Sequence, residues 1–148
     1  MRRLADVVVF SKGKEPVLVV EIDAARGTTP ASAAQFRKTL VENGLVENAP
    51  FMLIATRTTM FLWRRDTRLG DEANFAVPIE PVLRRYLKSP HDELRLSESI
   101  EILVHGWLQD LAIGIRTPDT AVAPDKMLLD SGLYELMHFG YVRFEMPA

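Results

Sequence analysis

The fold is decided by residues 6–23, which read DVVVFSKGKEPVLVVEID. Asp6 to Phe10 and Val17 to Asp23 are rich in β-branched residues, which favours two strands. The residues between them combine glycine, proline and polar side chains, as is typical of a turn. Both runs are apolar at consecutive positions, a pattern typical of strands covered on both faces. The stretch therefore predicts a hairpin at the centre of an α/β sheet.

A helix and two further strands are expected after the hairpin. Thr29 and Pro30 are suited to begin the helix, and Gly44 is suited to end it. Residues 51–63 contain two apolar runs separated by a short turn, which favours an antiparallel pair. Residues 1–65 are thus predicted to form a core of β-β-α-β-β order.

The rest of the chain, residues 66–148, is expected to complete the same domain mainly with helices. The predicted elements are a short helix from Pro81, a helix over residues 98–112 capped by Ser97, a helix over residues 127–137 and an edge strand over residues 141–145. We therefore expect one α/β domain over residues 1–148, with a mixed four-stranded central sheet flanked by helices.

Composition excludes several classes of protein. The 148 residues include no cysteine, which excludes disulfides, thiol nucleophiles and zinc–thiolate sites. No apolar run approaches the roughly 20 residues of a membrane helix, and no secretory signal pattern is recognised. We therefore expect a cytoplasmic protein with no membrane partner.

Charge divides unevenly along the chain. Residues 1–70 hold 11 basic and 7 acidic side chains, a balance of +4, whereas residues 71–148 hold 7 and 13, a balance of −6. A polyanion such as DNA would be expected to face the first half. The alternative is that both halves simply have solvated charged faces.

Three carboxylates converge at one end of the predicted hairpin. If the turn spans Lys12 to Glu15, the numbers of paired residues sum to 27, so Asp6 faces Glu21. Directly opposed residues have Cβ atoms about 4.5–5.5 Å apart, and Asp23 points to the same side as Glu21. A divalent cation, magnesium or manganese, would compensate the repulsion between these acids. The alternative is that the acids only mark where the strands emerge into water.

This pattern resembles the PD-(D/E)XK nuclease superfamily, and in particular the N-terminal nuclease-like domain of type I restriction-enzyme R subunits and their stand-alone relatives. In that family an Asp-bearing strand pairs with a Glu-x-Lys strand, and a helix with a Gln and two further strands follow. The matching residues are Asp6, Glu21, Gln35, the pair Ala55-Thr56 and the pair Leu62-Trp63. The resemblance covers residues 3–65 and implies a restriction-endonuclease-like core.

The resemblance also implies an activity, that of a magnesium-dependent DNA endonuclease acting in restriction–modification. Asp6 and Glu21 would hold the ion, which activates water and neutralises charge on the scissile phosphate. Gln35 would orient the site or contact DNA. Asp23 stands where the family has its lysine, and a carboxylate there adds repulsion near the phosphate. A non-catalytic module of the same fold, binding protein or nucleic acid, is therefore the alternative function.

Two side chains are candidates to replace the missing lysine. Lys38 follows Gln35 by one turn of the same helix and could reach the site; its alternative role is to pair with Glu42 in solvent. Asp23 could itself serve as a further metal ligand. Both are therefore counted among the candidate catalytic residues.

Four arginines are candidate contacts for a nucleic-acid backbone, namely Arg26, Arg64, Arg65 and Arg68. The alternative is that they are solvated residues of a loop and a strand end. DNA is the expected partner, and a homodimer or other subunits are further candidate partners.

Overall fold

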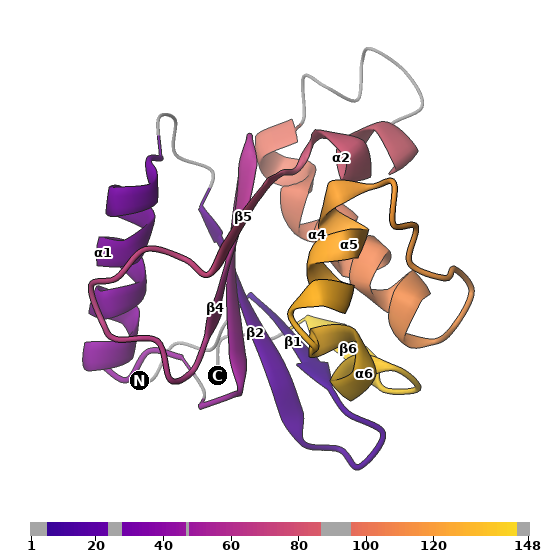
Figure 1. Ribbon diagram of the computed structural model, residues 1–148, viewed down its shortest axis with the longest axis horizontal. Helices are drawn as coiled ribbons and strands as arrows, with labels where there is room; N and C mark the ends of the chain where they lie inside the picture. The colour runs from indigo at the N-terminus through magenta and orange to yellow at the C-terminus, as the bar shows by residue number, and fades with distance from the viewer. Residues whose placement is uncertain (1–5, 24–27, 47, 87–95, 145–148) are drawn as a thin grey trace.

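The computed structural model describes residues 6–23, 28–46, 48–86 and 96–144, which form a mixed sheet between two layers of helices (Figure 1). The strands are β1 (Val7–Phe10), β2 (Pro16–Asp23), β3 (Phe51–Thr56), β4 (Thr59–Arg64), β5 (Phe75–Pro78) and β6 (Tyr141–Phe144). The helices are α1 (Pro30–Glu42), α2 (Glu80–Tyr86), α4 (Leu96–Ala112), α5 (Ala123–Asp130) and α6 (Leu133–Met137).

The sheet is covered on both faces, as its consecutive apolar residues predict. Helix α1 lies on one face, and α2, α4, α5 and α6 lie on the other (Figure 1). Val8 packs in the core on the α1 side, whereas Val7 and Val9 pack in the core on the opposite side. All three valines are fully buried.

The strand order is β5-β4-β3-β2-β1-β6. Strands β2 and β3 are parallel and joined through α1, while the other neighbouring pairs are antiparallel, including the expected pair β3–β4. The expected four-stranded sheet was wrong in its strand count and its order. The structure adds β5 beside β4, and the expected edge strand near residues 141–145 is β6, which pairs with β1. Strand β5 is short and only half-buried, and β6 closes onto β1 from the far end of the chain, so neither pairing has a local sequence signal.

The start of α1 follows the expected chemistry, whereas two later helices differ from expectation. Thr29 caps α1 and forms a capping box with Ser32, and Pro30 is the first helical residue. The expected helix over residues 127–137 divides into α5 and α6, because Gly132 adopts a left-handed φ of 85°. Helix α4 begins at Leu96, so Ser97 lies inside the helix rather than at its cap.

No helix in the described part of the chain is long and apolar enough to cross a membrane.

Candidate functional site

The β1–β2 register is the feature that positions the candidate site. Val7, Val8 and Val9 pair with Val20, Val19 and Leu18, in agreement with the expected sum of 27. Phe10 pairs instead with Pro16, across a β-bulge, and Ser11 closes the turn onto Glu15. The expected Phe10–Val17 pair was therefore wrong. The bulge compensates for the shifted turn, and it preserves the register toward the open end of the hairpin.

Three acids lie at that open end. One further step of the register places Asp6 opposite Glu21, and the main-chain N–H of Ile22 donates a 2.7 Å hydrogen bond to Oδ2 of Asp6. Asp23 accepts a 3.1 Å hydrogen bond from Oγ1 of Thr28, just before α1 begins. Alternation along β2 puts Glu21 and Asp23 on the α1 side of the sheet. All three acids that the sequence singles out therefore lie at the same end of the hairpin.

The three acids differ in exposure. Glu21 is fully buried, whereas Asp6 and Asp23 are half-buried. Burial of a carboxylate is costly unless hydrogen bonds, a proton or a cation compensate it. A cation would approach from the side of Asp6 and Asp23.

Glu101 on α4 is a fourth acid near this end, and sequence reasoning missed it. Its pKa is raised above the usual value, first by burial and then by the negative charge of Asp6. Glu101 follows Ile100 at the edge of the apolar stripe of α4. Its charge at that edge is the local sequence feature that could have pointed to it as a site residue. Its proximity to Asp6 depends on how α4 packs against the sheet.

A magnesium site at this end of the hairpin would use two carboxylates. Within the described ranges, no group of three or more His, Asp or Glu side chains is arranged to hold a metal ion. Magnesium commonly binds one or two protein carboxylates together with waters and substrate phosphates. Asp6 and Glu21 can supply such a pair, while the carboxylate of Asp23 is engaged by Thr28.

Gln35 and Lys38 lie on α1, away from the three acids. Gln35 is exposed, on the side of the helix opposite the buried face. Lys38 is half-buried and lies nine residues after Thr29, roughly 14 Å along the helix axis. Helix α1 begins beside Asp23 and runs back along the sheet. Lys38 therefore lies closer to the C-terminal end of α1 than to the three acids.

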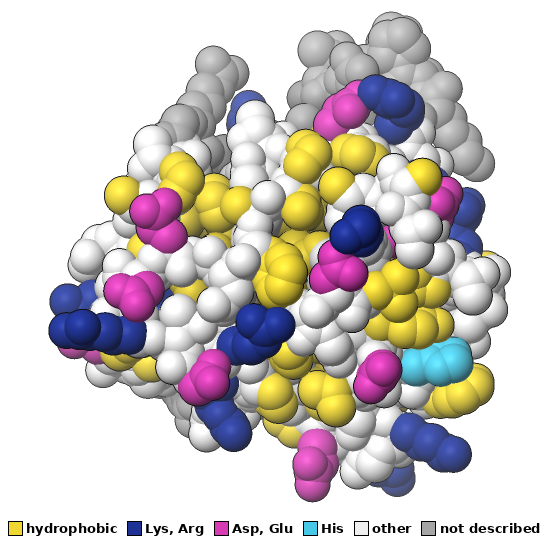
Figure 2. Space-filling view, viewed as in Figure 1, with side chains coloured by type: hydrophobic (Ala, Val, Ile, Leu, Met, Phe, Trp, Pro, Cys, Tyr) yellow, Lys and Arg dark blue, Asp and Glu magenta, His cyan; other side chains and the backbone are white. Residues whose placement is uncertain are grey.

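The three candidate DNA-contact arginines that the structure describes have different surroundings. The guanidinium of Arg64 lies over the ring of Phe75, 5.3 Å from its centroid. Arg65 and Arg68 are exposed in the segment after β4, and Arg26 lies outside the described residues. Basic and acidic side chains alternate over the face shown in Figure 2, with no continuous basic surface.

Comparisons of the chain with protein-family models, with curated proteins and with solved structures find no match. The class of protein that the structure defines is therefore an α/β protein with a mixed sheet between helices. The relation to a particular family rests on the motif residues alone.

Proposed function

We infer that this protein is a magnesium-dependent DNA endonuclease of the PD-(D/E)XK type, or a descendant that retains the fold and the acids. The observation that supports this function most strongly is the β1–β2 register, which when extended by one step places Asp6 opposite Glu21 at the open end of the hairpin. The hydrogen bond from Ile22 to Asp6 supports that placement. Manganese would serve in place of magnesium.

The reaction would be hydrolysis of a phosphodiester. A water oxygen bonds to phosphorus as a P–O bond of the DNA backbone breaks; one proton of the water goes to the leaving hydroxyl and the other to solvent. Asp6 and Glu21 would hold the ion, which supplies an activated water and charge neutralisation when bound. The role of Glu101 in this function is to add negative potential beside Asp6, which strengthens attraction for a divalent cation.

A non-catalytic module of the same fold is the second candidate function. The observation that favours it is Asp23, which occupies the position of the motif lysine and lies on the same face as Glu21. Lys38 lies toward the other end of α1, so it is a poor substitute for that lysine. Such a module would bind nucleic acid or a protein partner without cleaving DNA.

Nicking of supercoiled plasmid distinguishes the two candidates. The unmodified protein is incubated with plasmid and magnesium, with manganese, or with a chelator, next to the Glu21→Gln variant. Glu15→Gln is the matched control, because Glu15 is an exposed acid in the turn of the same hairpin. Metal-dependent nicking that Glu21→Gln abolishes and Glu15→Gln retains would support the endonuclease.

The opposite result has an equally clear meaning. If the folded protein and its folded Asp23→Lys variant nick no plasmid with either metal, the endonuclease is wrong. The non-catalytic module then becomes the function to pursue.

A further inference from the structure

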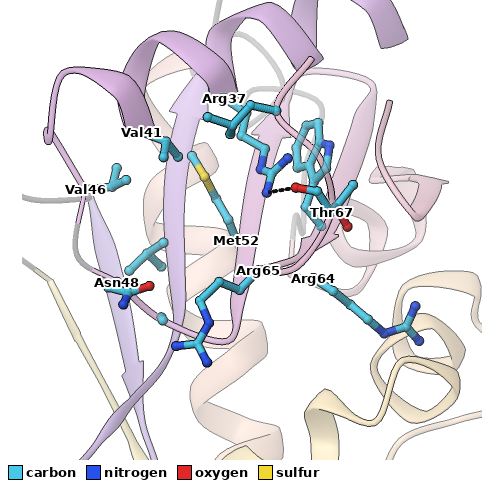
Figure 3. Close-up of a pocket in the computed structure, with 12 residues that line it drawn as sticks. Arg37, Val41, Val46, Asn48, Met52, Arg64, Arg65 and Thr67 are labelled. Atoms are coloured by element: carbon cyan, nitrogen blue, oxygen red, sulfur yellow. Dashed lines mark hydrogen bonds between the residues drawn. The ribbon is translucent and has the colours of Figure 1, made fainter. Parts of the chain in front are cut away.

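A cavity of about 320 Å³ lies on the α1 side of the sheet, away from the three acids (Figure 3). Its floor is apolar and is formed by Val19, Met52 and Trp63 of three adjacent strands. Val41 of α1 and Val46 complete the apolar wall. A cavity of about 150 Å³ can hold benzene, so this one has room for a two-ring body.

Arg37 brings a buried cation to this cavity. Its side chain is 4% exposed, and its guanidinium carbon lies 5.6 Å from the centroid of the Trp63 ring. Nη2 donates a 3.0 Å hydrogen bond to the carbonyl of Thr67, and Nη1 donates a 3.4 Å bond to the carbonyl of Arg68. Its Nε is buried and has no hydrogen-bond partner among the described residues. Arg37, which lines the cavity, therefore has one charged donor without a hydrogen-bond partner among the described residues.

The electrostatic setting favours an anion. Burial lowers the pKa of Arg37, and the negative charge of the nearby Asp71 partly offsets this effect. The charged residues among the described lining residues are all arginines, Arg37, Arg64 and Arg65. The guanidinium of Arg64 points away from the cavity and lies over Phe75, so Arg37 and Arg65 supply the positive charge (Figure 3). A guanidinium edge binds a carboxylate through two parallel hydrogen bonds, which suits a donor at Nε.

We propose that this cavity binds a small organic carboxylate, with its apolar body between α1 and the sheet and its anionic group on Arg37. Small-molecule sites are commonly apolar cavities of about 300–1,000 Å³ with a few polar groups that fix orientation, and this cavity has that character. Arg65 at the rim adds positive potential that favours entry of an anion. This binding does not depend on the proposed nuclease function, because the cavity shares no residue with the acids.

Calorimetric titration with 2-naphthoate, and with its neutral counterpart 2-naphthamide, tests the proposal directly. The carboxylate is expected to bind at one site and at least about tenfold more tightly than the amide, the loss expected for removing a hydrogen bond between charged groups. The Val41→Trp variant should weaken binding by a similar factor, because Val41 lines the cavity and is 40% exposed, so a larger side chain can fill the mouth without entering the core.

Two further variants make the test specific. Thr39→Trp is the matched control, since Thr39 is exposed on the same helix and does not line the cavity. It should bind 2-naphthoate as the parent does. Arg37→Gln should lose the preference for the acid over the amide; if this variant fails to fold, Val41→Trp and the amide comparison still decide the outcome.

Three results would overturn the proposal. One is the absence of binding of 2-naphthoate and of octanoate at millimolar concentration. Another is equal affinity for acid and amide, and a third is binding that Val41→Trp leaves unchanged. If a single-stranded oligonucleotide binds in a Val41→Trp-sensitive manner while neither acid binds, the cavity belongs to a nucleic-acid surface instead.

Discussion

Oδ2 of Asp6 accepts a 2.7 Å hydrogen bond from the main-chain N–H of Ile22, the residue after Glu21. This bond joins the residue before β1 to the end of β2 and holds the carboxylate of Asp6 beside Glu21. The side chain of Asp6 therefore has two properties that a substitution can test one at a time: it accepts a hydrogen bond, and it carries a negative charge. An asparagine retains the acceptor and removes the charge.

The Asp6→Asn variant should therefore lose magnesium binding and keep its fold. Its amide oxygen can accept the bond from Ile22, and the loss of a charge beside Glu21 removes repulsion, so the thermal midpoint should be unchanged or raised. Titration calorimetry and thermal unfolding measure the two effects. Asp66→Asn, at an exposed position after β4, is the control. Equal magnesium affinity in Asp6→Asn and the parent would count against the site.

The Asp23→Lys variant should gain magnesium-dependent nicking. The change places a positive charge on the face of β2 that carries Glu21, where it can stabilise negative charge developing on the phosphate. Groups of this kind are worth about 10²–10³ in rate, which a plasmid assay detects readily. Asp130→Lys, an exposed change of the same charge on α5, should add nothing. If Lys38 supplies the function instead, Lys38→Ala abolishes nicking and Asp23→Lys adds little.

The exposed arginines after β4 should contribute to a salt-dependent interaction with duplex DNA. Each phosphate contact contributes about 0.9 to the slope of log K against log salt. Replacing Arg65 and Arg68 by Gln should therefore lower that slope by about 2, measured by fluorescence anisotropy. Arg64→Gln should lower it less, because that guanidinium packs on Phe75. Absence of DNA binding at about 50 mM salt, where such contacts are strong, would refute the prediction.

The Glu101→Gln variant should be more stable than the parent at neutral pH. Burial and the charge of Asp6 raise the pKa of Glu101 above its ordinary value of 4.5. The folded state thus binds this proton more tightly than the unfolded state, and stability falls as pH rises from 4.5 through the raised pKa. The variant should have the higher thermal midpoint at pH 7, and the difference should shrink below pH 4.5.

An exposed acid provides the control for this pH dependence. Glu135 lies on α6 and is exposed, so Glu135→Gln should not reproduce the gain at pH 7. If the parent and Glu101→Gln have the same thermal midpoint at pH 7, the pKa of Glu101 is not raised by burial and by Asp6, and the prediction is wrong.

The Gly140→Ala variant should be strongly destabilised. A Cβ at Gly140 would lie 1.9 Å from the main-chain oxygen of Phe10, so the chain between α6 and β6 would have to move away from β1. Overpacking of this kind costs about 3 kcal/mol, measured as the free energy of unfolding in denaturant. Gly13→Ala is the control, because its nearest contact would be an unstrained 3.7 Å. Equal stability of the two variants would contradict the tight approach of β6 to β1.

Several helices and strands could be predicted from the sequence because they depend on residues that are close together in the chain. The cap of α1 depends on Thr29 and Pro30, and the two covered faces follow from consecutive apolar residues. The single helix expected over residues 127–137 is instead divided by the left-handed φ of Gly132. Trp107 of α4 is fully buried. Its indole Nε1 donates a 2.8 Å bond to Asp125, a buried partner that no local pattern indicates.

The sequence by itself determined the hairpin and the register of Val7 to Val9, which when extended places Asp6 opposite Glu21. Strand pairing across a short turn depends on adjacent residues. Tertiary structure alone decided the pairing of β6 with β1, the approach of Glu101 to Asp6 and the burial of Arg37 against Trp63. Periodicity identifies which face of an element is buried, but it does not identify the partner. Partners distant in sequence are chosen by how all the elements pack together, and that choice decides which charges share a surface.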